Sequence, residues 1–515
     1  MLARTRAGCV VGVAAVAVDV EVHLSKGLPG FDLVGLPETA VRESRVRVRA
    51  ALANQGYSLP PRRVTLSLAP ADLRKRGASL DLAIAVALLS ACGSCPPNRL
   101  EETLLFGELS LSGELRPSRG LLPQLRDLRS RGVVRAIVPR DQLTEGALVS
   151  DIDVRGAHDL ADVVAFLASE IELPRAASVT PSALAEVGPR APDLMEVRGQ
   201  MAAKRALEIA AAGAHPILMI GPPGAGKTML ARRLPGILPA PTPPEALAIA
   251  TIASAAGLPR PTRRPFRAPH HTASPASLVG GGDPVRPGEV TLAHLGVLFL
   301  DELPEFSRAS IESFRVILES GESVISRVRE RVTMPARPLV VAAMNPCPCG
   351  YDGDPTRLCR CTPARVAAYR GKVSGPMLDR FALHIALPPV RLRELRAMPK
   401  PEEGSEVIRG RVQAARERLR DAPVAQQPTA LLDRLPSAAR ELLIDAGEAM
   451  GLSMRSFAHA ARVARTIAAL DDADEVALEH VAEALAYRLV DARSEVVGRQ
   501  SSGRDVLAPR KERVR

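Results

Sequence analysis

A glycine-rich loop that joins an apolar strand to a helix constrains the fold of this chain more than any other feature. The strand is predicted at Ile217–Ile220, and it runs directly into Gly221-Pro-Pro-Gly-Ala-Gly-Lys227-Thr228, followed by a helix from Met229. A GxxxxGK[ST] loop in this context binds nucleotide phosphates. Because such loops lie at the edge of a parallel sheet, the chain is predicted to contain an α/β domain.

The residues of this loop are expected to hold ATP and Mg²⁺ in distinct ways. Gly224 and Gly226 let backbone N–H groups turn towards the phosphates, and the N-terminus of the following helix adds its dipole. Lys227 is expected to reach the β- and γ-phosphates, and Thr228 to ligate Mg²⁺. The predicted nucleotide-binding residues of the loop are Gly221, Pro222, Pro223, Gly224, Ala225, Gly226, Lys227 and Thr228.

Two further strands are predicted to end in polar residues that complete a hydrolytic site. The apolar segment Gly296–Leu300 is followed by Asp301 and Glu302, and acids after a buried strand lie at the ligand-binding edge of an open α/β sheet. Asp301 is predicted to hold the Mg²⁺ shell, and Glu302 to polarise the attacking water as general base. Asn345, after the strand Leu339–Ala343, is predicted to orient that water, with a turn-forming Asn as the alternative.

Two arginines that follow the strands of this core are candidates for stabilising transition-state charge. Arg380 lies in Leu378-Asp-Arg-Phe381, and Arg455 lies in Leu452-Ser-Met-Arg-Ser456. We expect one of them to act across a subunit boundary. Read without its context, either arginine is a solvated surface residue.

The length and the pattern of the chain indicate about three domains. Strand-like and helical stretches alternate in the first third and again in the middle, whereas the last part is helical in pattern. The predicted divisions are an N-terminal α+β domain at 1–172, a linker rich in Pro, Ala and Ser at 173–193, an α/β core at 194–390, a helical lid and C-terminal domain at 391–500, and a disordered basic tail at 501–515.

Long and unusual motifs extend over nearly the whole chain. They are Gly35-Leu-Pro-Glu-Thr-Ala-Val41, Leu68-Ala-Pro-Ala-Asp72, Phe266-Arg-Ala-Pro-His-His-Thr272, Gly296–Phe306, Ala343-Met-Asn-Pro-Cys-Pro-Cys-Gly350 and Ser374-Gly-Pro-Met-Leu-Asp-Arg380. Together with the site residues, these motifs resemble the magnesium-chelatase-like AAA+ ATPases, and specifically the YifB/ComM family. The resemblance implies a homo-hexameric ring with ATP sites shared between neighbours, Arg380 as arginine finger and Arg455 as second sensor.

The same resemblance implies a β-hairpin that points into the pore of the ring. The matching segment is Val324-Ile-Ser-Arg-Val-Arg-Glu-Arg-Val332, and its arginines Arg327, Arg329 and Arg331 would face a DNA backbone. An ordinary solvated hairpin is the alternative. The glycine-rich Leu278–Gly288 resembles a mobile loop inserted beside the same pore. The net charge of +11 favours a polyanionic partner, although solvated arginines account for it equally well.

The N-terminal domain resembles the non-ATPase domain of this family, which shares its fold with the Lon protease domain and ribosomal protein S5. In Lys75-Arg-Gly-Ala-Ser79-Leu-Asp81 a serine falls where the Lon nucleophile lies. That serine requires a lysine base, but the partner position in Arg119-Gly-Leu-Leu122-Pro holds Leu122. The resemblance therefore implies a Lon-like domain without protease activity.

Four of the seven cysteines lie in one short window, as Cys347-x-Cys349 and Cys359-x-Cys361. Four thiolates satisfy a tetrahedral Zn²⁺ with no open position, so the pattern predicts a structural zinc site directly after Asn345. Free thiols in a reducing compartment are the alternative. His270 and His271 are interpreted as hydrogen-bonded loop residues rather than as metal ligands or pore residues.

No apolar run reaches the roughly 18 residues that a membrane span requires. The apolar stretch Cys9–Val18 is followed by Asp19 and Glu21, so it is interpreted as the first strand of a folded domain rather than as a secretion signal. A cytoplasmic protein is therefore expected.

These features predict a motor that acts on single-stranded or branched DNA. Its activity would be branch migration or unwinding, in recombination or in DNA uptake. The alternatives are a chelatase-type motor, against which the Lon-like domain argues, and a protein-remodelling AAA+ motor.

Overall fold

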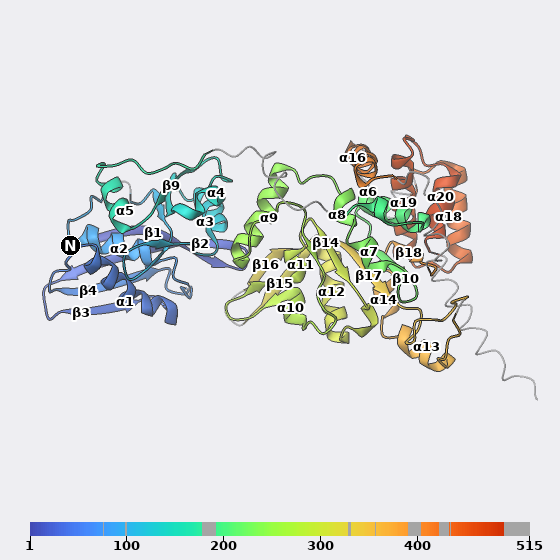
Figure 1. Cartoon of the computed structure of the whole chain (residues 1–515), viewed down its shortest axis with the longest axis horizontal. Helices are drawn as coiled ribbons and strands as arrows, with labels where there is room; N and C mark the ends of the chain where they lie inside the picture. Colours follow the sequence, from blue (N-terminus) through green and yellow to red (C-terminus); the bar gives the residue numbers. More distant parts are fainter. Residues whose placement is uncertain are drawn as a thin grey trace, which may run out of the picture.

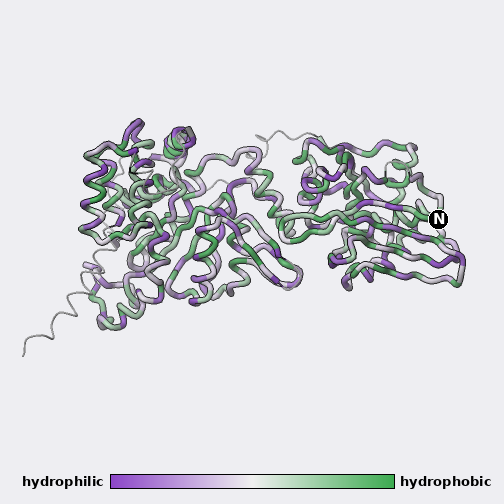
Figure 2. Tube along the Cα trace, turned by 180° about the vertical axis from the view of Figure 1, so that it is seen from behind, coloured by the Kyte–Doolittle hydropathy of each residue, from purple (hydrophilic) through white to green (hydrophobic). Residues whose placement is uncertain are grey.

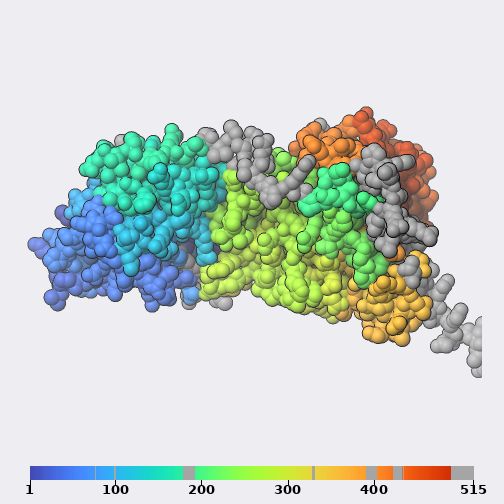
Figure 3. Space-filling model, in the orientation of Figure 1, coloured from blue at the N-terminus to red at the C-terminus, as the bar shows by residue number. Residues whose placement is uncertain are grey.

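The computed structural model describes residues 1–75, 77–97, 100–177, 192–327, 331–355, 357–389, 403–421, 432 and 434–488. Figure 1 shows an elongated molecule in which an N-terminal α/β unit, a central α/β unit and a C-terminal helical region follow one another. The space-filling view in Figure 3 shows the first two units in contact along a broad front.

The N-terminal unit is built on a seven-stranded mixed sheet, in the order β3-β4-β2-β1-β5-β8-β9. Its strands are β1 (Leu2–Val11), β2 (Ala14–Ser25), β3 (Gly30–Val34), β4 (Arg63–Ala69), β5 (Thr103–Leu105), β8 (Arg135–Pro139) and β9 (Asp153–Ala157). The accompanying elements are α1 (Thr39–Asn54), α2 (Asp81–Ala91), β6 (Glu108–Leu109), β7 (Leu115–Arg116), α3 (Leu121–Arg129), η1 (Arg140–Gln142), α4 (Leu143–Gly146) and α5 (Leu160–Leu167).

The first strand begins earlier than the sequence predicts. The stretch Cys9–Val18 is not one strand, because a turn at Gly12 and Val13 divides it between β1 and β2, which pair antiparallel. Arg4 lies within β1 and bonds to Glu21 across the pair. The basic start that resembles a secretion signal is therefore part of the sheet.

The segment after this unit remains attached to it at first. Leu173 packs in the hydrophobic core of the unit, and Ala176 donates its backbone N–H to the carbonyl of Val154 on β9. The first residues of the predicted linker thus extend the sheet edge. Most of that linker, 178–191, lies outside the described residues, as does the predicted tail 501–515.

The central unit confirms the predicted mixed α/β fold with a parallel sheet. The strands β11 (Phe266–Arg267), β14 (Val297–Leu300), β17 (Leu339–Met344), β10 (Ile217–Ile220) and β18 (Leu383–Ala386) lie in that order, all parallel. Both faces of the sheet are covered, since Val297 and Phe299 belong to one hydrophobic core and Leu298 and Leu300 to another. Continuous apolar strands are typical of sheets buried on both sides.

Short helices and turns surround this sheet. They are η3 (Leu194–Glu196), α6 (Met201–Gly213), α7 (Lys227–Ala231), α8 (Leu234–Ile237), α9 (Pro243–Ala256), α10 (Pro275–Val279), α11 (Glu289–Leu292), η4 (Leu303–Glu305), α12 (Arg308–Ser320), α13 (Pro363–Arg370) and α14 (Gly375–Leu378).

Two antiparallel hairpins project beside the sheet. The glycine-rich segment predicted as a mobile loop contains β12 (Gly280–Gly281) and β13 (Arg286–Pro287). The predicted arginine hairpin is present as β15 (Glu322–Ser326) and β16 (Arg331–Pro335). One face of this second hairpin packs inwards and the other is open to solvent.

The N-terminal unit packs against the inward face of that hairpin (Figure 1). Val13, from the β1–β2 turn, shares a hydrophobic cluster with Ile252 of α9, Val332 and Met334 of β16. The approach is so close that a Cβ on Gly12 would lie 2.5 Å from a methyl group of Val332. The two units are thus joined by packed side chains as well as by the chain itself.

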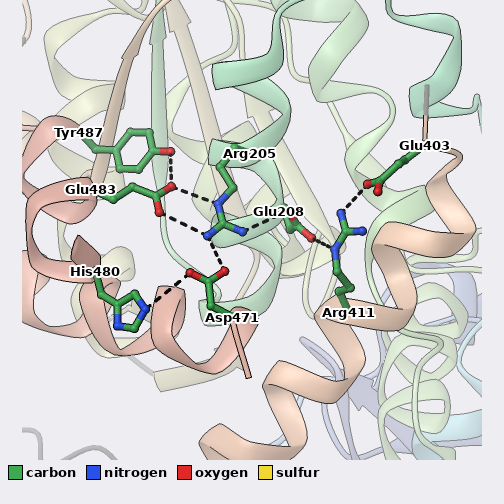
Figure 4. A network of polar contacts seen from close by, with 8 residues as sticks. All are labelled: Arg205, Glu208, Glu403, Arg411, Asp471, His480, Glu483 and Tyr487. Carbon is green, nitrogen blue, oxygen red and sulfur yellow. Dashed lines mark hydrogen bonds and ion pairs between the residues drawn. The ribbon is translucent and has the colours of Figure 1, made fainter. Parts of the chain in front are cut away.

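The C-terminal region is helical, as predicted. Its helices are α16 (Ser405–Asp421), α18 (Ser437–Ala449), α19 (Met454–Leu470) and α20 (Leu478–Ala486). Figure 4 shows the polar network that ties this region to the central unit. Arg205 of α6 bonds to Glu483 and Asp471, and Glu208, also of α6, bonds to Arg411 of α16.

Apolar and polar residues alternate over short distances along the strands and helices, as the tube in Figure 2 shows. Within the described ranges, no helix combines the length and the apolar character that a membrane crossing requires.

Candidate nucleotide-binding site

The phosphate loop has the backbone geometry that its sequence requires. Gly224 and Gly226 have φ values of 80° and 92°, in the left-handed region that favours glycine. A Cβ at either position would meet no atom within 4 Å, so the space in front of the loop is open. The loop begins at the end of β10, and α7 starts at Lys227. Backbone N–H groups and a helix N-terminus thus border a space suited to phosphates.

Lys227 connects the loop to the neighbouring strand. Its Nζ donates to the carbonyl oxygens of Gly221 at 2.5 Å and Pro222 at 3.0 Å, and to Oδ1 of Asn345 at 2.9 Å. Burial lowers the pKa of Lys227, while the charges of Asp301 and Glu302 oppose this shift. Lys227 was predicted to reach the β- and γ-phosphates and Asn345 to orient the attacking water, and the structure brings these two side chains together.

Thr228 and Asp301 form the second polar pair. The Thr228 hydroxyl donates to Oδ2 of Asp301 at 2.8 Å, and the other carboxylate oxygen accepts the backbone N–H of Glu302 at 3.0 Å. One hydroxyl and one carboxylate at the edge of the sheet are hard oxygen ligands of the kind that Mg²⁺ takes together with substrate phosphates. These residues therefore fit the predicted Mg²⁺–ATP site.

Glu302 lies next to His271, a contact that the sequence interpretation missed. Its backbone is left-handed, with φ at 53°, and its side chain is half exposed. Nδ1 of His271 lies 3.2 Å from its Oε2. Arg267 of β11 pairs with Leu298 of β14, and His271 and Glu302 lie in the turns that follow these two neighbouring strands.

Arg380 and Arg455 converge on one carboxylate rather than on the phosphate loop. Both guanidinium groups contact Oε1 of Glu319 on α12. Arg380 is nearly buried and also donates to the carbonyls of Arg315 and Pro376, and burial lowers its pKa. Arg455 is less buried, with 44% of its side chain exposed. The two predicted arginines therefore lie at the same face of the molecule.

The four clustered cysteines come together as a potential metal site. All four Sγ atoms lie within 4.8 Å of one another, and Cys347 Sγ is 3.3 Å from Cys349 and 3.6 Å from Cys359. Tetrahedral Zn–S bonds of about 2.3 Å place sulfur atoms about 3.8 Å apart, so the spacing fits Zn²⁺. Hydrogen bonds from the backbone N–H groups of Arg360 and Tyr351 hold the pKa of Cys349 below its ordinary value. The donor set suits zinc.

This cysteine segment touches the phosphate loop. Gly350, the residue after Cys349, has a φ of 86°, and a Cβ there would lie 2.5 Å from Cδ of Pro223. Pro223 belongs to the phosphate loop, so only glycine permits the approach. The shape of the cysteine segment is thus coupled by contact to that of the nucleotide site.

The hairpin arginines are partly described. Arg327 and Arg331 are exposed at the tip, and Arg331 pairs with Ser326 across the strands. Arg329 lies outside the described residues. The exposed position of the two described arginines suits contact with a polyanion, and equally suits the solvated alternative.

Among the residues that the structure describes, no lysine side chain forms a hydrogen bond with Ser79 of the N-terminal unit. Leu122, at the expected position of the base, is buried in the hydrophobic core. Lys75 is buried nearby in sequence, but its Nζ donates to the carbonyl of Pro70. Ser79 instead lines a cavity of about 220 Å³ that it shares with Val285 of the central unit.

The chain matches family models along most of its length. A model described as magnesium chelatase, subunit ChlI, matches residues 193–395. A second, subunit ChlI of Mg-chelatase, matches 20–142, and a third, the C-terminal part of subunit ChlI, matches 402–488.

The chain is also similar to named bacterial proteins over nearly its full length. It is 43% identical to the uncharacterized protein YifB of Escherichia coli (strain K12), covering 95% of this chain and 97% of that protein. It is 43% identical to YifB of Salmonella typhimurium, with the same coverage. It is 42% identical to the competence protein ComM of Haemophilus influenzae, covering 93% of this chain and 95% of ComM.

Proposed function

Because the chain belongs to the YifB/ComM family of magnesium-chelatase-like AAA+ proteins, we propose that it is a ring-forming ATPase that works on DNA. The family itself implies ATP and Mg²⁺ as cofactors and an oligomeric assembly. The action on DNA, the hexameric ring and the individual residue roles are the parts that we propose.

One observation carries the proposal of ATP hydrolysis. Three polar residues meet at the carboxyl edge of three adjacent parallel strands: Lys227 after β10, Asp301 after β14 and Asn345 after β17. Mg²⁺ bound to ATP would neutralise charge that develops on the phosphates. Lys227 would bind the β- and γ-phosphates, and Thr228 and Asp301 would hold the ion. These residues already lie at one edge of the sheet, so binding of ATP and Mg²⁺ would need no rearrangement of its strands.

Glu302 and Asn345 would act on the attacking water. The carboxylate of Glu302 would accept a proton from the water as it approaches the γ-phosphorus, and the Asn345 amide would orient it. Both side chains follow strands of the same sheet, β14 and β17, which are direct neighbours.

Arg380 and Arg455 would complete the site of a neighbouring subunit. Their shared contact with Glu319 brings them together, and this single carboxylate balances only one of the two positive charges. In a ring closed by a head-to-tail interface, the γ-phosphate of the neighbour would compete with Glu319 for both guanidinium groups. The finger role of Arg380 thus requires an assembled ring.

DNA is the proposed partner. The exposed arginines at the tip of the β15–β16 hairpin and the net charge of +11 support a polyanion. One relative is named a competence protein, which agrees with a role in the uptake or recombination of DNA. We propose translocation on single-stranded or branched DNA, with branch migration or unwinding as the result.

A chelatase-type or protein-remodelling motor is the second candidate. A family model named for a magnesium chelatase subunit covers residues 20–142 as well as the ATPase core. The N-terminal unit therefore does not by itself separate this chain from chelatase motors. Stimulation by DNA is the property that distinguishes the candidates.

The test is the steady-state rate of ATP hydrolysis with and without a synthetic four-way DNA junction, at fixed salt. We expect stimulation by the junction, and loss of hydrolysis in Glu302→Gln at every DNA concentration. A rate of ATP hydrolysis that is unchanged by DNA but changes with a metal-free tetrapyrrole or with a protein substrate would overturn the DNA proposal.

A further inference from the structure

We infer that the cavity between the two α/β units binds a small anion of the phosphate type, one that still carries a hydrogen to donate. The inference does not depend on the proposed action on DNA, because it concerns a different part of the molecule. It assigns a class of ligand to a cavity that the nucleotide-binding site does not use.

Both units build this cavity, which has a volume of about 220 Å³. One water molecule needs only about 10–15 Å³ of such space, so a small molecule fits. The polar and charged residues that line it include Ser79, Glu108, Arg119 and Gln124 of the N-terminal unit and Arg286 of the central unit. A ligand in the cavity would therefore touch both units at once.

Two arginines, one from each unit, line the cavity without an acidic partner. Among the residues that the structure describes, neither Arg119 nor Arg286 forms an ion pair or a side-chain hydrogen bond. Burial lowers the pKa of Arg119, and the positive charge of Arg286 lowers it further. Because a guanidinium group stays protonated in proteins, the two charges repel each other. An anion between them would relieve this repulsion.

The backbone holds the two arginines in place. Gly120, the residue after Arg119, donates its backbone N–H to the carbonyl of Ser254 on α9 at 2.9 Å. Arg286 pairs with Gly281 across the β12–β13 hairpin. Both arginine residues are exposed, so the charged end of the cavity is open to solvent and a ligand can enter there.

Two buried polar side chains line the same cavity. Gln124 is 1% exposed and Ser79 is 7% exposed, and neither side chain has a hydrogen-bond partner in the described part of the chain. A Cβ on Gly8 would lie 2.5 Å from Oε1 of Gln124, so glycine at that position makes room for the amide. Buried polar groups are normally hydrogen-bonded. The amide and the hydroxyl can both donate to the oxygens of an anion.

Glu108 determines which anion is favoured. Its half-buried side chain lines the cavity, and within the described ranges it has no ion pair or hydrogen bond. A carboxylate only accepts hydrogen bonds, so a fully ionised anion such as sulfate would be repelled by it. Phosphate retains a hydrogen near neutral pH and can donate it to Glu108. We therefore expect phosphate, or a small phosphate ester with hydroxyl groups, to bind in preference to sulfate.

The first experiment titrates inorganic phosphate into the full-length protein by calorimetry at constant ionic strength. It compares Arg119→Ala/Arg286→Ala with Arg62→Ala/Arg263→Ala, which also removes one exposed arginine from each unit but none that lines the cavity. Phosphate also binds at the phosphate loop, so the reading is the difference between these two proteins, whose loops are identical. We expect one binding step to weaken about tenfold or more in the first variant and to persist in the control.

The second experiment tests the choice of anion. In the unaltered protein the cavity should bind phosphate more tightly than sulfate. Glu108→Gln presents an amide that donates as well as accepts, so it should bind the two anions with similar affinity. Competition by glycerol 3-phosphate would identify a phosphate ester as the natural type of ligand. Absence of competition, with phosphate bound, would identify inorganic phosphate.

Two results would overturn the inference. Equal phosphate binding by the two double variants, both shown to be folded by circular dichroism, would remove the site from the cavity. Equal affinity for sulfate and phosphate at the cavity of the unaltered protein would remove the role of Glu108. If the double variant fails to fold, Arg286→Ala alone gives the reading, since this exposed arginine lies on a short hairpin. Failure of the proposed function would appear in ATP hydrolysis and would leave these titrations unchanged.

Discussion

The two α/β units of this chain differ in how their sheets gather side chains. In the central unit all five strands run parallel, so the ends of β10, β14 and β17 bring Lys227, Asp301 and Asn345 to one edge. In the N-terminal unit β2 runs antiparallel to both of its neighbours, and Ser79 lies two residues before α2. A parallel sheet concentrates its loops at one edge, and that is where open α/β folds place their chemistry.

The N-terminal unit uses its antiparallel part for contact instead. The β1–β2 turn packs on the hairpin and on α9, and Leu122 donates its backbone N–H to the Ser254 hydroxyl on α9 at 3.2 Å. The comparison predicts that changes at the carboxyl edge of the central sheet abolish ATP hydrolysis, whereas changes at Ser79 leave it intact.

The largest expected effect is that of Lys227→Ala, which should abolish ATP binding because no other cation in the loop reaches the phosphates. Binding of a fluorescent ATP analogue measures this directly. The matched variant Glu302→Gln should bind ATP but hydrolyse it very slowly, since it loses only the base. Normal turnover in Glu302→Gln would remove that assignment.

Arg380→Ala should retain ATP binding and lower kcat by about 10³-fold, the effect typical of an arginine finger. Since the residue would serve a neighbour, mixing this variant with Lys227→Ala should restore some hydrolysis at interfaces that pair an intact loop with an intact finger. Absence of rescue at every mixing ratio, with rings confirmed by sedimentation, would place Arg380 in its own subunit or outside catalysis.

Cys349→Ser should remove a zinc ion, expected at about one per chain, and should also slow hydrolysis, because Gly350 packs on Pro223 of the phosphate loop. Elemental analysis of protein purified under reducing conditions without chelators measures the metal. Cys92→Ser, in the N-terminal unit, is the control and should change neither quantity. A zinc-free unaltered protein would favour the free-thiol alternative.

The double change Arg327→Ala/Arg329→Ala should weaken DNA binding and flatten the log–log dependence of affinity on salt by about one for each DNA phosphate that is no longer neutralised. Basal hydrolysis should survive, while stimulation by DNA should disappear. Deleting 501–515 provides the comparison, since that basic tail is the competing site. Stimulation that survives the double change and disappears with the tail would contradict the hairpin assignment.

The smallest effect is expected for Ser79→Ala. Without a lysine base the hydroxyl has no nucleophilic role, so ATP hydrolysis, its stimulation by DNA and the absence of peptidase activity should be unchanged. If the unaltered chain cleaved an unfolded protein substrate and Ser79→Ala abolished this cleavage, the N-terminal unit would be catalytic too. That result would contradict the difference between the two units.

The sequence alone determined the parts of this protein that depend on neighbouring residues. The loop Gly221–Thr228 defines its own strand, turn and helix, and the apolar strands Val297–Leu300 and Leu339–Met344 appear within a residue of their predicted limits. The same local rules identified the helical C-terminal region and the cysteine cluster, whereas the arginine hairpin was implied by the resemblance to the family. The periodicity of strands and helices, the backbone geometry of glycine and the spacing of ligands can each be recognised within a few residues of sequence. Predicting these features therefore needs no knowledge of distant contacts.

Only the tertiary structure decided which distant residues meet. The pairing of His271 with Glu302 depends on β11 and β14 being neighbours in the sheet. The convergence on Glu319 of α12 depends on Arg380, after α14, and Arg455, at the start of α19, lying close together. The packing of Gly12 on Val332 follows from the contact between the two units. Such contacts arise from the free energy of burying whole surfaces, which is a property of the assembled chain and not of any single segment.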